Sequence, residues 1–105
     1  MIYYYFYKKN EKIKKIQVFG HSLYNKKNND IVCSSVSTAI ILTLNNLKML
    51  GLQKNIDYIL KDGFLNLKIL KQNSIMIILL NNLEYSLKEL EKNYKKYIKE
   101  YSNIK

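Results

Sequence analysis

The sequence contains no proline, no tryptophan and no arginine, and it has only three glycines. Because proline and glycine mark most linkers and chain breaks, their scarcity leaves no obvious domain boundary. A chain of 105 residues is close to the common size of one domain. We therefore expect residues 1–105 to form a single domain.

Long hydrophobic runs are also missing. The longest, Ile75 to Leu80, is far shorter than the roughly 20 residues that cross a bilayer. The opening "MIYYYFYKK" lacks the basic region, apolar stretch and cleavage site of a signal peptide. These absences predict a soluble protein with no membrane partner.

Cysteine and histidine occur once each, as Cys33 and His21. A single cysteine excludes an internal disulfide, and no Cys/His cluster has the spacing of a zinc site. We expect no metal and no cofactor. A reducing, cytoplasmic location is the natural interpretation.

The basic charge comes entirely from 18 lysines, which give a formal net charge of +10. Arginine is the usual reader of base edges, and these lysines are scattered through every segment. The abundance of Lys, Asn, Ile and Tyr is typical of A/T-rich codon usage. The charge thus indicates no specific nucleic-acid site, although weak attraction to RNA or ribosomes is compatible with it.

The fold prediction starts from two hairpins. Residues Ile2 to Tyr7 and Ile13 to Phe19 are rich in β-branched and aromatic residues, with "KKNEK" as the turn between them. The stretch "DYILKDGFLNLKIL" contains two further strand-like runs joined at Asp62-Gly63, a strong hairpin signal.

Each hairpin precedes a segment with helical spacing. Asp30 is a good N-cap and Gly51 a good stop for the first helix, and Asn73 or Ser74 would cap the second. Together the segments predict an α+β, two-layer sandwich of ββαββα order. The expected apolar faces are Val32, Val36, Ala39, Ile40, Leu44, Leu47 and Leu50 in the first helix, and Ile75, Ile78, Leu79, Leu83, Leu87, Leu90, Tyr94, Tyr97, Ile98 and Tyr101 in the second.

The predicted elements place His21 at the end of the second strand and Cys33 in the first turn of the first helix. A thiolate at a helix N-terminus is stabilised by the helix dipole and by backbone N–H groups, and an adjacent imidazole stabilises it further. The same N–H groups could form an oxyanion hole. The alternative is that Cys33 is a small core residue and His21 a surface residue.

The pattern around these residues resembles the ribosomal-processing cysteine protease family, Prp. Gly20-His21 is followed by Cys33 within "DIVCSSVST", where the family has a Gly-His-Ala-like start and an Asp-Ile-Val-Cys-Ala-Ala-Val-Ser-Ala-like helix opening. The changes from family alanines are small-for-small, and the last dozen residues correspond only loosely. The matching positions are Gly20, His21, Asp30, Ile31, Val32, Cys33, Val36 and Ser37, and the replaced alanines are Ser22, Ser34, Ser35 and Thr38.

The resemblance implies a cysteine endopeptidase with Cys33 as nucleophile and His21 as base. It also implies a substrate, the short N-terminal extension of the twenty-seventh large-subunit ribosomal protein, cut after a pair of aromatic residues. The family is usually homodimeric, and its loop between His and Cys is thought to move over the substrate. That loop corresponds here to Asn25, Lys26, Lys27, Asn28 and Asn29, which carry nothing apolar to hold them down.

Three matched residues are candidates for supporting roles. Asp30 caps the helix or, less simply, orients His21. Ser37 lies one turn beyond Cys33 and either contacts the loop or substrate or merely fills space. Gly20 permits a backbone geometry or a close substrate approach that a Cβ would block.

Two other functions stay open at this point. A small basic protein could associate with ribosomes or RNA without catalysis, and a structural homodimer could sense oxidation through its single cysteine. A thiolate near neutral pH is needed by the protease, whereas the non-catalytic ribosome- or RNA-associated protein predicts an ordinary or less reactive thiol.

Overall fold

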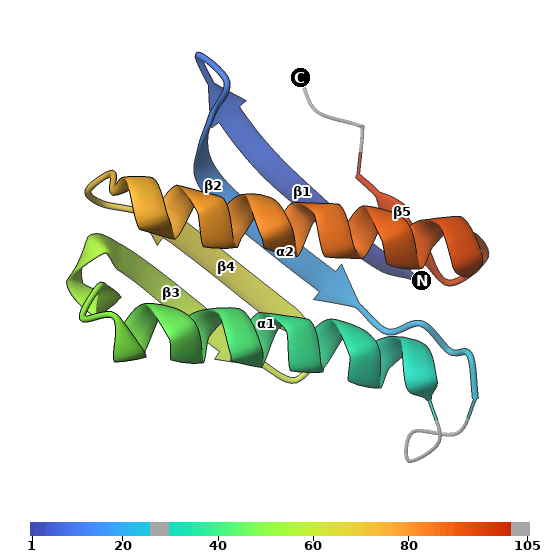
Figure 1. The fold of residues 1–105 in the computed structure, drawn as a ribbon. Helices are drawn as coiled ribbons and strands as arrows, with labels where there is room; N and C mark the ends of the chain where they lie inside the picture. The colour runs from blue at the N-terminus through green and yellow to red at the C-terminus, as the bar shows by residue number, and fades with distance from the viewer. Residues whose placement is uncertain (26–29, 102–105) are drawn as a thin grey trace.

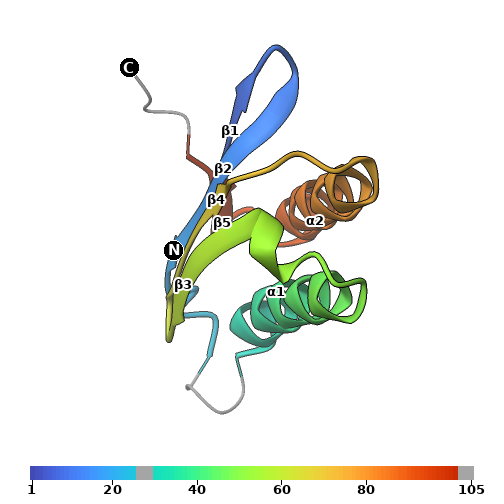
Figure 2. The same cartoon turned by 90° about the vertical axis from the view of Figure 1, so that its left-hand side faces the viewer.

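The computed structural model describes residues 1–25 and 30–101, which form a mixed sheet with two helices on one face (Figure 1). Figure 2 shows the two layers edge-on, with α1 and α2 side by side on one side of the sheet. This is the predicted α+β, two-layer arrangement, with one additional strand. In chain order the elements are β1 (Ile2–Lys9), β2 (Lys12–Gly20), α1 (Ile31–Met49), the 3₁₀ turn η2 (Gln53–Asn55), β3 (Ile56–Lys61), β4 (Phe64–Ile69), α2 (Ser74–Asn93) and β5 (Ile98–Glu100).

The sheet has the strand order β3-β4-β2-β1-β5. Both predicted hairpins are present. Asn10 and Glu11 turn the first with φ values of 54° and 66°, and Asp62-Gly63 turns the second between the paired residues Lys61 and Phe64. Because β2 pairs with β4 in the centre, the end of β2 lies beside the turn of the second hairpin.

Helix α1 begins as predicted, with the Asp30 side chain as its N-cap. It ends at a left-handed glycine, Gly51, with φ +74°. Its buried face is the predicted one except at Leu50, which is 51% exposed because it lies at the C-cap, beyond the last helical turn. The buried residues are Val32, Val36, Ile40, Leu44 and Leu47.

By length and composition α1 could also cross a membrane. This is weak evidence, because the core helix of a soluble protein passes the same test. Here one face of α1 joins the hydrophobic core that also includes strands β1, β2 and β4.

Helix α2 differs from the prediction in its inner face and its end. Ile75 and Ile78 are 51% and 66% exposed, so their prediction as core residues is wrong. Asn73 does cap the helix, accepting hydrogen bonds from the N–H groups of Ile75 and Met76. The prediction is confirmed at Leu83 and Leu87, which are buried. The full set of buried residues in α2 is Met76, Leu80, Leu83, Glu84 and Leu87.

The predicted continuation of α2 through Tyr101 is also wrong, because the helix ends at Asn93 and the chain forms β5. Ile98 is fully buried, and β5 pairs in parallel with β1. Glu91 holds this region together: its Oε1 accepts from the Tyr4 hydroxyl at 2.6 Å and from the Glu100 N–H at 3.2 Å. Burial raises the pKa of Tyr4, and the hydrogen bond to Glu91 raises it further.

Candidate active site

Cys33 is the third residue of α1 and lies in the first turn after the N-cap Asp30. The Asp30 Oδ1 atom accepts from the N–H groups of Val32 at 3.1 Å and of Cys33 at 3.0 Å. The predicted cap and the predicted position of Cys33 are therefore confirmed. The same bonds make the oxyanion-hole expectation wrong for these two N–H groups, because the carboxylate already occupies them.

Cys33 is a partly exposed residue, and its sulfur lies against Ser22. The Ser22 N–H donates to Sγ at 3.3 Å, and the Ser22 hydroxyl oxygen lies 3.4 Å from Sγ. That hydroxyl also donates to Asp30 Oδ2. Ser22, the residue after His21, thus connects the thiol of Cys33 to the carboxylate that caps its helix.

Asp30 is buried, with 4% of its surface exposed. Burial by itself favours the neutral acid, but hydrogen bonds from the Cys33 N–H, the Ser22 hydroxyl and the Tyr24 N–H favour the carboxylate. The balance holds the pKa of Asp30 below its ordinary value. Asp30 is therefore a fixed negative charge at neutral pH.

His21 follows the last residue of β2, the central strand of the sheet, and is exposed. Its ring lies against Gly63 in the β3–β4 turn, where a Cβ would be 2.6 Å from Nε2 and 2.7 Å from Cε1. The Gly20 N–H donates to the Gly63 carbonyl at 3.0 Å, which fixes the turn beside the histidine. The amino group of Met1 donates to the His21 carbonyl.

Gly20 has a φ of +107°, in the region that favours glycine. A Cβ there would lie 2.3 Å from the carbonyl oxygen of Met1. The structure therefore accounts for Gly20 by its backbone geometry and by the close approach of Met1, a segment of this chain.

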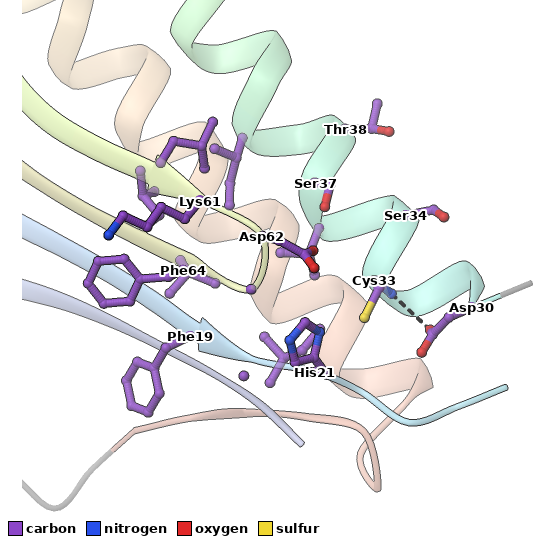
Figure 3. Close-up of a pocket in the computed structure, with 18 of the residues that line it drawn as sticks. Phe19, His21, Asp30, Cys33, Ser34, Ser37, Thr38, Lys61, Asp62 and Phe64 are labelled. Atoms are coloured by element: carbon purple, nitrogen blue, oxygen red, sulfur yellow. Dashed lines mark hydrogen bonds between the residues drawn. The ribbon is translucent and has the colours of Figure 1, made fainter. Parts of the chain in front are cut away.

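His21 and Cys33 line one pocket of about 750 Å³. Figure 3 shows the Cys33 sulfur pointing toward the imidazole ring, with Asp62 beside them. Asp30 and Ser37, two of the three candidate supporting residues, line the pocket with Gly20, the third. The rest of the wall includes Ile2, Val18, Phe19, Leu23, Ile40, Ile41, Leu60, Lys61, Phe64 and Leu65.

The predicted mobile loop lies mostly outside the described residues. Asn25 is described and lines the pocket. Lys26, Lys27, Asn28 and Asn29 are not among the described residues.

Two site residues carry no functional signal in the sequence. Ser22 is a small replacement for a family alanine, yet it contacts the sulfur. Gly63 is a turn residue whose missing side chain also leaves room for the His21 ring. In the sequence, the hairpin turn already accounts for a glycine after Asp62. Only the pairing of β2 with β4 reveals that Gly63 also contacts His21.

No group of three or more His, Cys, Asp or Glu side chains able to hold a metal occurs within residues 1–25 and 30–101.

Comparison with known families decides the relationship. The model of the family "Cysteine protease Prp" matches residues 1–99. The chain belongs to the Prp family of cysteine proteases. This confirms the resemblance drawn from the motif around His21 and Cys33, and with it the prediction of a cysteine protease.

Solved structures have the same fold. The essential ribosomal processing protease Prp from S. aureus, in complex with a covalently linked product peptide, is 23% identical with a TM-score of 0.86, covering 95% of this chain and 97% of that one. Its complex with a substrate peptide is 22% identical with a TM-score of 0.80, covering 96% and 98%. SMU.848 from Streptococcus mutans is 19% identical with a TM-score of 0.74, covering 95% and 91%. A comparison with curated proteins found no match.

Proposed function

We propose that this Prp-family protein is a cysteine endopeptidase in which Cys33 is the nucleophile and His21 the general base. The observation that carries the proposal is that the only cysteine and the only histidine of the chain line one pocket. Membership of a cysteine protease family supports it. Cys33 is partly exposed and His21 exposed, so a peptide can reach both.

The proposed reaction has two stages. His21 takes the thiol proton, the sulfur attacks the scissile carbonyl carbon, and the C–N bond breaks as His21 returns the proton to the leaving amine. Water, deprotonated by His21, then hydrolyses the thioester and releases the acid product and the free thiol. The Ser22 N–H, 3.3 Å from Sγ, stabilises the thiolate.

The substrate proposal rests on the family resemblance and on the pocket wall. We expect an N-terminal extension of the twenty-seventh large-subunit ribosomal protein, cut after two aromatic residues. Phe19, Phe64 and Leu60 line the pocket and supply apolar and aromatic surface for such side chains. Crystal structures of the S. aureus protease with substrate and product peptides are consistent with a peptide ligand in this fold.

Location and assembly follow from the same proposal. A protease that trims a ribosomal protein acts in the cytoplasm, which agrees with the single unpaired cysteine. The family resemblance implies a homodimer. The net charge of +10 gives no attraction to a basic ribosomal protein, so selection falls to the apolar pocket.

The test of the proposal is cleavage of a peptide that carries two adjacent aromatic residues. Cys33→Ala and Cys33→Ser should both abolish cleavage, because each removes the nucleophile at little cost in packing. Ser35→Ala, on the same helix but outside the pocket, is the matched control and should cleave like the unmodified protein. Equal cleavage by Cys33→Ser and the unmodified protein would contradict the proposal.

A further inference from the structure

Ser22 forms a bridge between the thiol of Cys33 and the carboxylate of Asp30. Its side chain is buried, with 3% of the residue exposed. The hydroxyl donates to Asp30 Oδ2, lies 3.4 Å from Cys33 Sγ, and accepts from the Tyr24 N–H at 3.3 Å. These contacts determine which part of the hydroxyl faces the sulfur.

A serine hydroxyl has one proton and two lone pairs. Asp30, as a carboxylate, can only accept hydrogen bonds, and it already accepts from the N–H groups of Val32 and Cys33. A bond from a hydroxyl to a carboxylate is stronger than one to a neutral thiol. The proton of Ser22 is therefore directed at Asp30, and a lone pair is left facing Sγ.

We propose that Ser22 is a positioning residue whose hydroxyl oxygen accepts the thiol proton of Cys33 and thereby favours the neutral thiol in the resting protein. The backbone N–H of the same residue donates to Sγ and acts in the opposite direction. A side-chain substitution removes the hydroxyl and its contacts and leaves this backbone N–H bond in place. The inference rests on the proposed function in that it assigns Ser22 to the nucleophile named there.

Other charged or titratable groups line the pocket with Cys33. They are His21 after the end of β2, Asp30 at the cap of α1, and Lys61 and Asp62 from β3 and its turn. All of them are retained in Ser22→Ala. A difference between that variant and the unmodified protein therefore reports the Ser22 hydroxyl.

The experiment measures the rate at which iodoacetamide labels Cys33 between pH 5 and 9. Ser22→Ala should move the rate profile to lower pH, with labelling about three- to tenfold faster on its acidic limb, as expected for the loss of one neutral hydrogen bond. Ser35→Ala is the matched control, because its hydroxyl donates to the Ile31 carbonyl at 2.7 Å and lies outside the pocket. Its profile should match that of the unmodified protein.

Slower labelling of Ser22→Ala, or an unchanged profile, would overturn the inference, since it would mean that the hydroxyl donates to the thiolate or does not affect it. Circular dichroism verifies that each variant is folded. Ser22→Gly also deletes the hydroxyl and should shift the profile in the same direction, so it replaces Ser22→Ala if that variant does not fold.

A second background tests the role of Asp30. The amide of Asp30→Asn can donate to the Ser22 oxygen, which frees the hydroxyl proton to turn toward sulfur. In that background Ser22→Ala should no longer accelerate labelling. If the freed hydroxyl proton does turn toward the sulfur, Ser22→Ala should slow labelling. An undiminished acceleration would show that Asp30 does not control the hydroxyl, and the inference would be wrong.

Labelling needs no peptide substrate, so this inference and the proposed function can fail separately. If the profile shifts but the unmodified protein cleaves no peptide, the endopeptidase proposal fails while the Ser22 assignment holds. If peptides are cleaved and the profile stays unchanged, the Ser22 assignment alone fails.

Discussion

Gly63 lies directly against the His21 ring, so close that a Cβ on the glycine would be 2.6 Å from Nε2. The contact joins the β3–β4 turn to the residue that follows β2. Gly63 is far from the Gly20-His21 motif in the sequence, yet it limits where the ring of the proposed base can lie.

Gly63→Ala should therefore impair catalysis beyond its effect on stability. Both Gly63, φ +73°, and Gly51, φ +74°, are left-handed, so alanine at either should cost about 1–2 kcal/mol. Only at Gly63 must the histidine also move, and we expect kcat/KM to fall by at least about tenfold. Gly51→Ala is the matched control, because a Cβ there has nothing within 4 Å. Equal kcat/KM for the two variants would contradict this role of Gly63.

His21→Ala should lower kcat/KM by about 10²- to 10⁴-fold, the usual contribution of a general base. The substitution should also slow iodoacetamide labelling of Cys33 near neutral pH, because the thiolate loses its imidazolium partner. The two measurements together test the pairing. If labelling depends on pH in the same way with and without His21, the residues do not act as a pair.

Asp30 should make the stability of the fold depend on pH. The pKa of this carboxyl is lower in the folded protein than its ordinary value. Its stabilising contribution is therefore complete above the ordinary value, near pH 4, and is lost as the pH falls through the lower folded value. Urea unfolding from pH 7 to pH 2.5 should show the unmodified protein more stable than Asp30→Asn at neutral pH, with the gap shrinking below about pH 4.

The matched control for that series is Asp57→Asn, which also removes one negative charge but from an exposed position on β3. The loss of unfolding free energy in Asp30→Asn should be compared with the loss in Asp57→Asn at each pH. If the loss in Asp30→Asn stays constant from neutral to acid pH, the network around Asp30 does not hold its carboxylate.

Substrate selection should depend on aromatic side chains and only weakly on salt. Replacing the two aromatic residues of a test peptide by alanine should abolish detectable cleavage, because burial of each side chain is worth about 1.5–3 kcal/mol. At physiological ionic strength the Debye length of about 8 Å screens the lysines, so added salt should change the rate little. A steep loss of rate with salt, combined with indifference to the aromatics, would favour charge-driven binding.

Much of the fold was predictable because its signals are local. Asp30 and Asn73 cap helices through their own backbone neighbours, and Asp62-Gly63 forms the turn that its dipeptide favours. The motif around His21 and Cys33 gave the family in the same way. Each of these predictions depends on residues close together in the sequence.

The wrong extent of the second helix and the unrecognised roles of Ser22 and Gly63 concern interactions between distant segments. The spacing of Tyr94, Tyr97, Ile98 and Tyr101 fits a helix, but the free edge of β1 offers backbone partners that only the assembled sheet reveals, and Ile98 is buried there. The roles of Ser22 and Gly63 are hidden for the same reason. Ser22 meets the thiol only after the chain returns from β2 to α1, and Gly63 meets His21 only because β4 pairs with β2.

The two proposed reacting groups belong to different layers of the molecule, since His21 extends from the sheet and Cys33 from a helix that rests on it. The hydrophobic core between the two layers keeps them together, because Val32 and Val36 of α1 belong to the same core as Val18 of β2. A partly unfolded state that kept α1 and its cap but lost this packing would contain both residues. It would not hold His21 next to Cys33. Peptide cleavage would therefore be a sensitive reporter of tertiary order, failing on heating before the helical signal does.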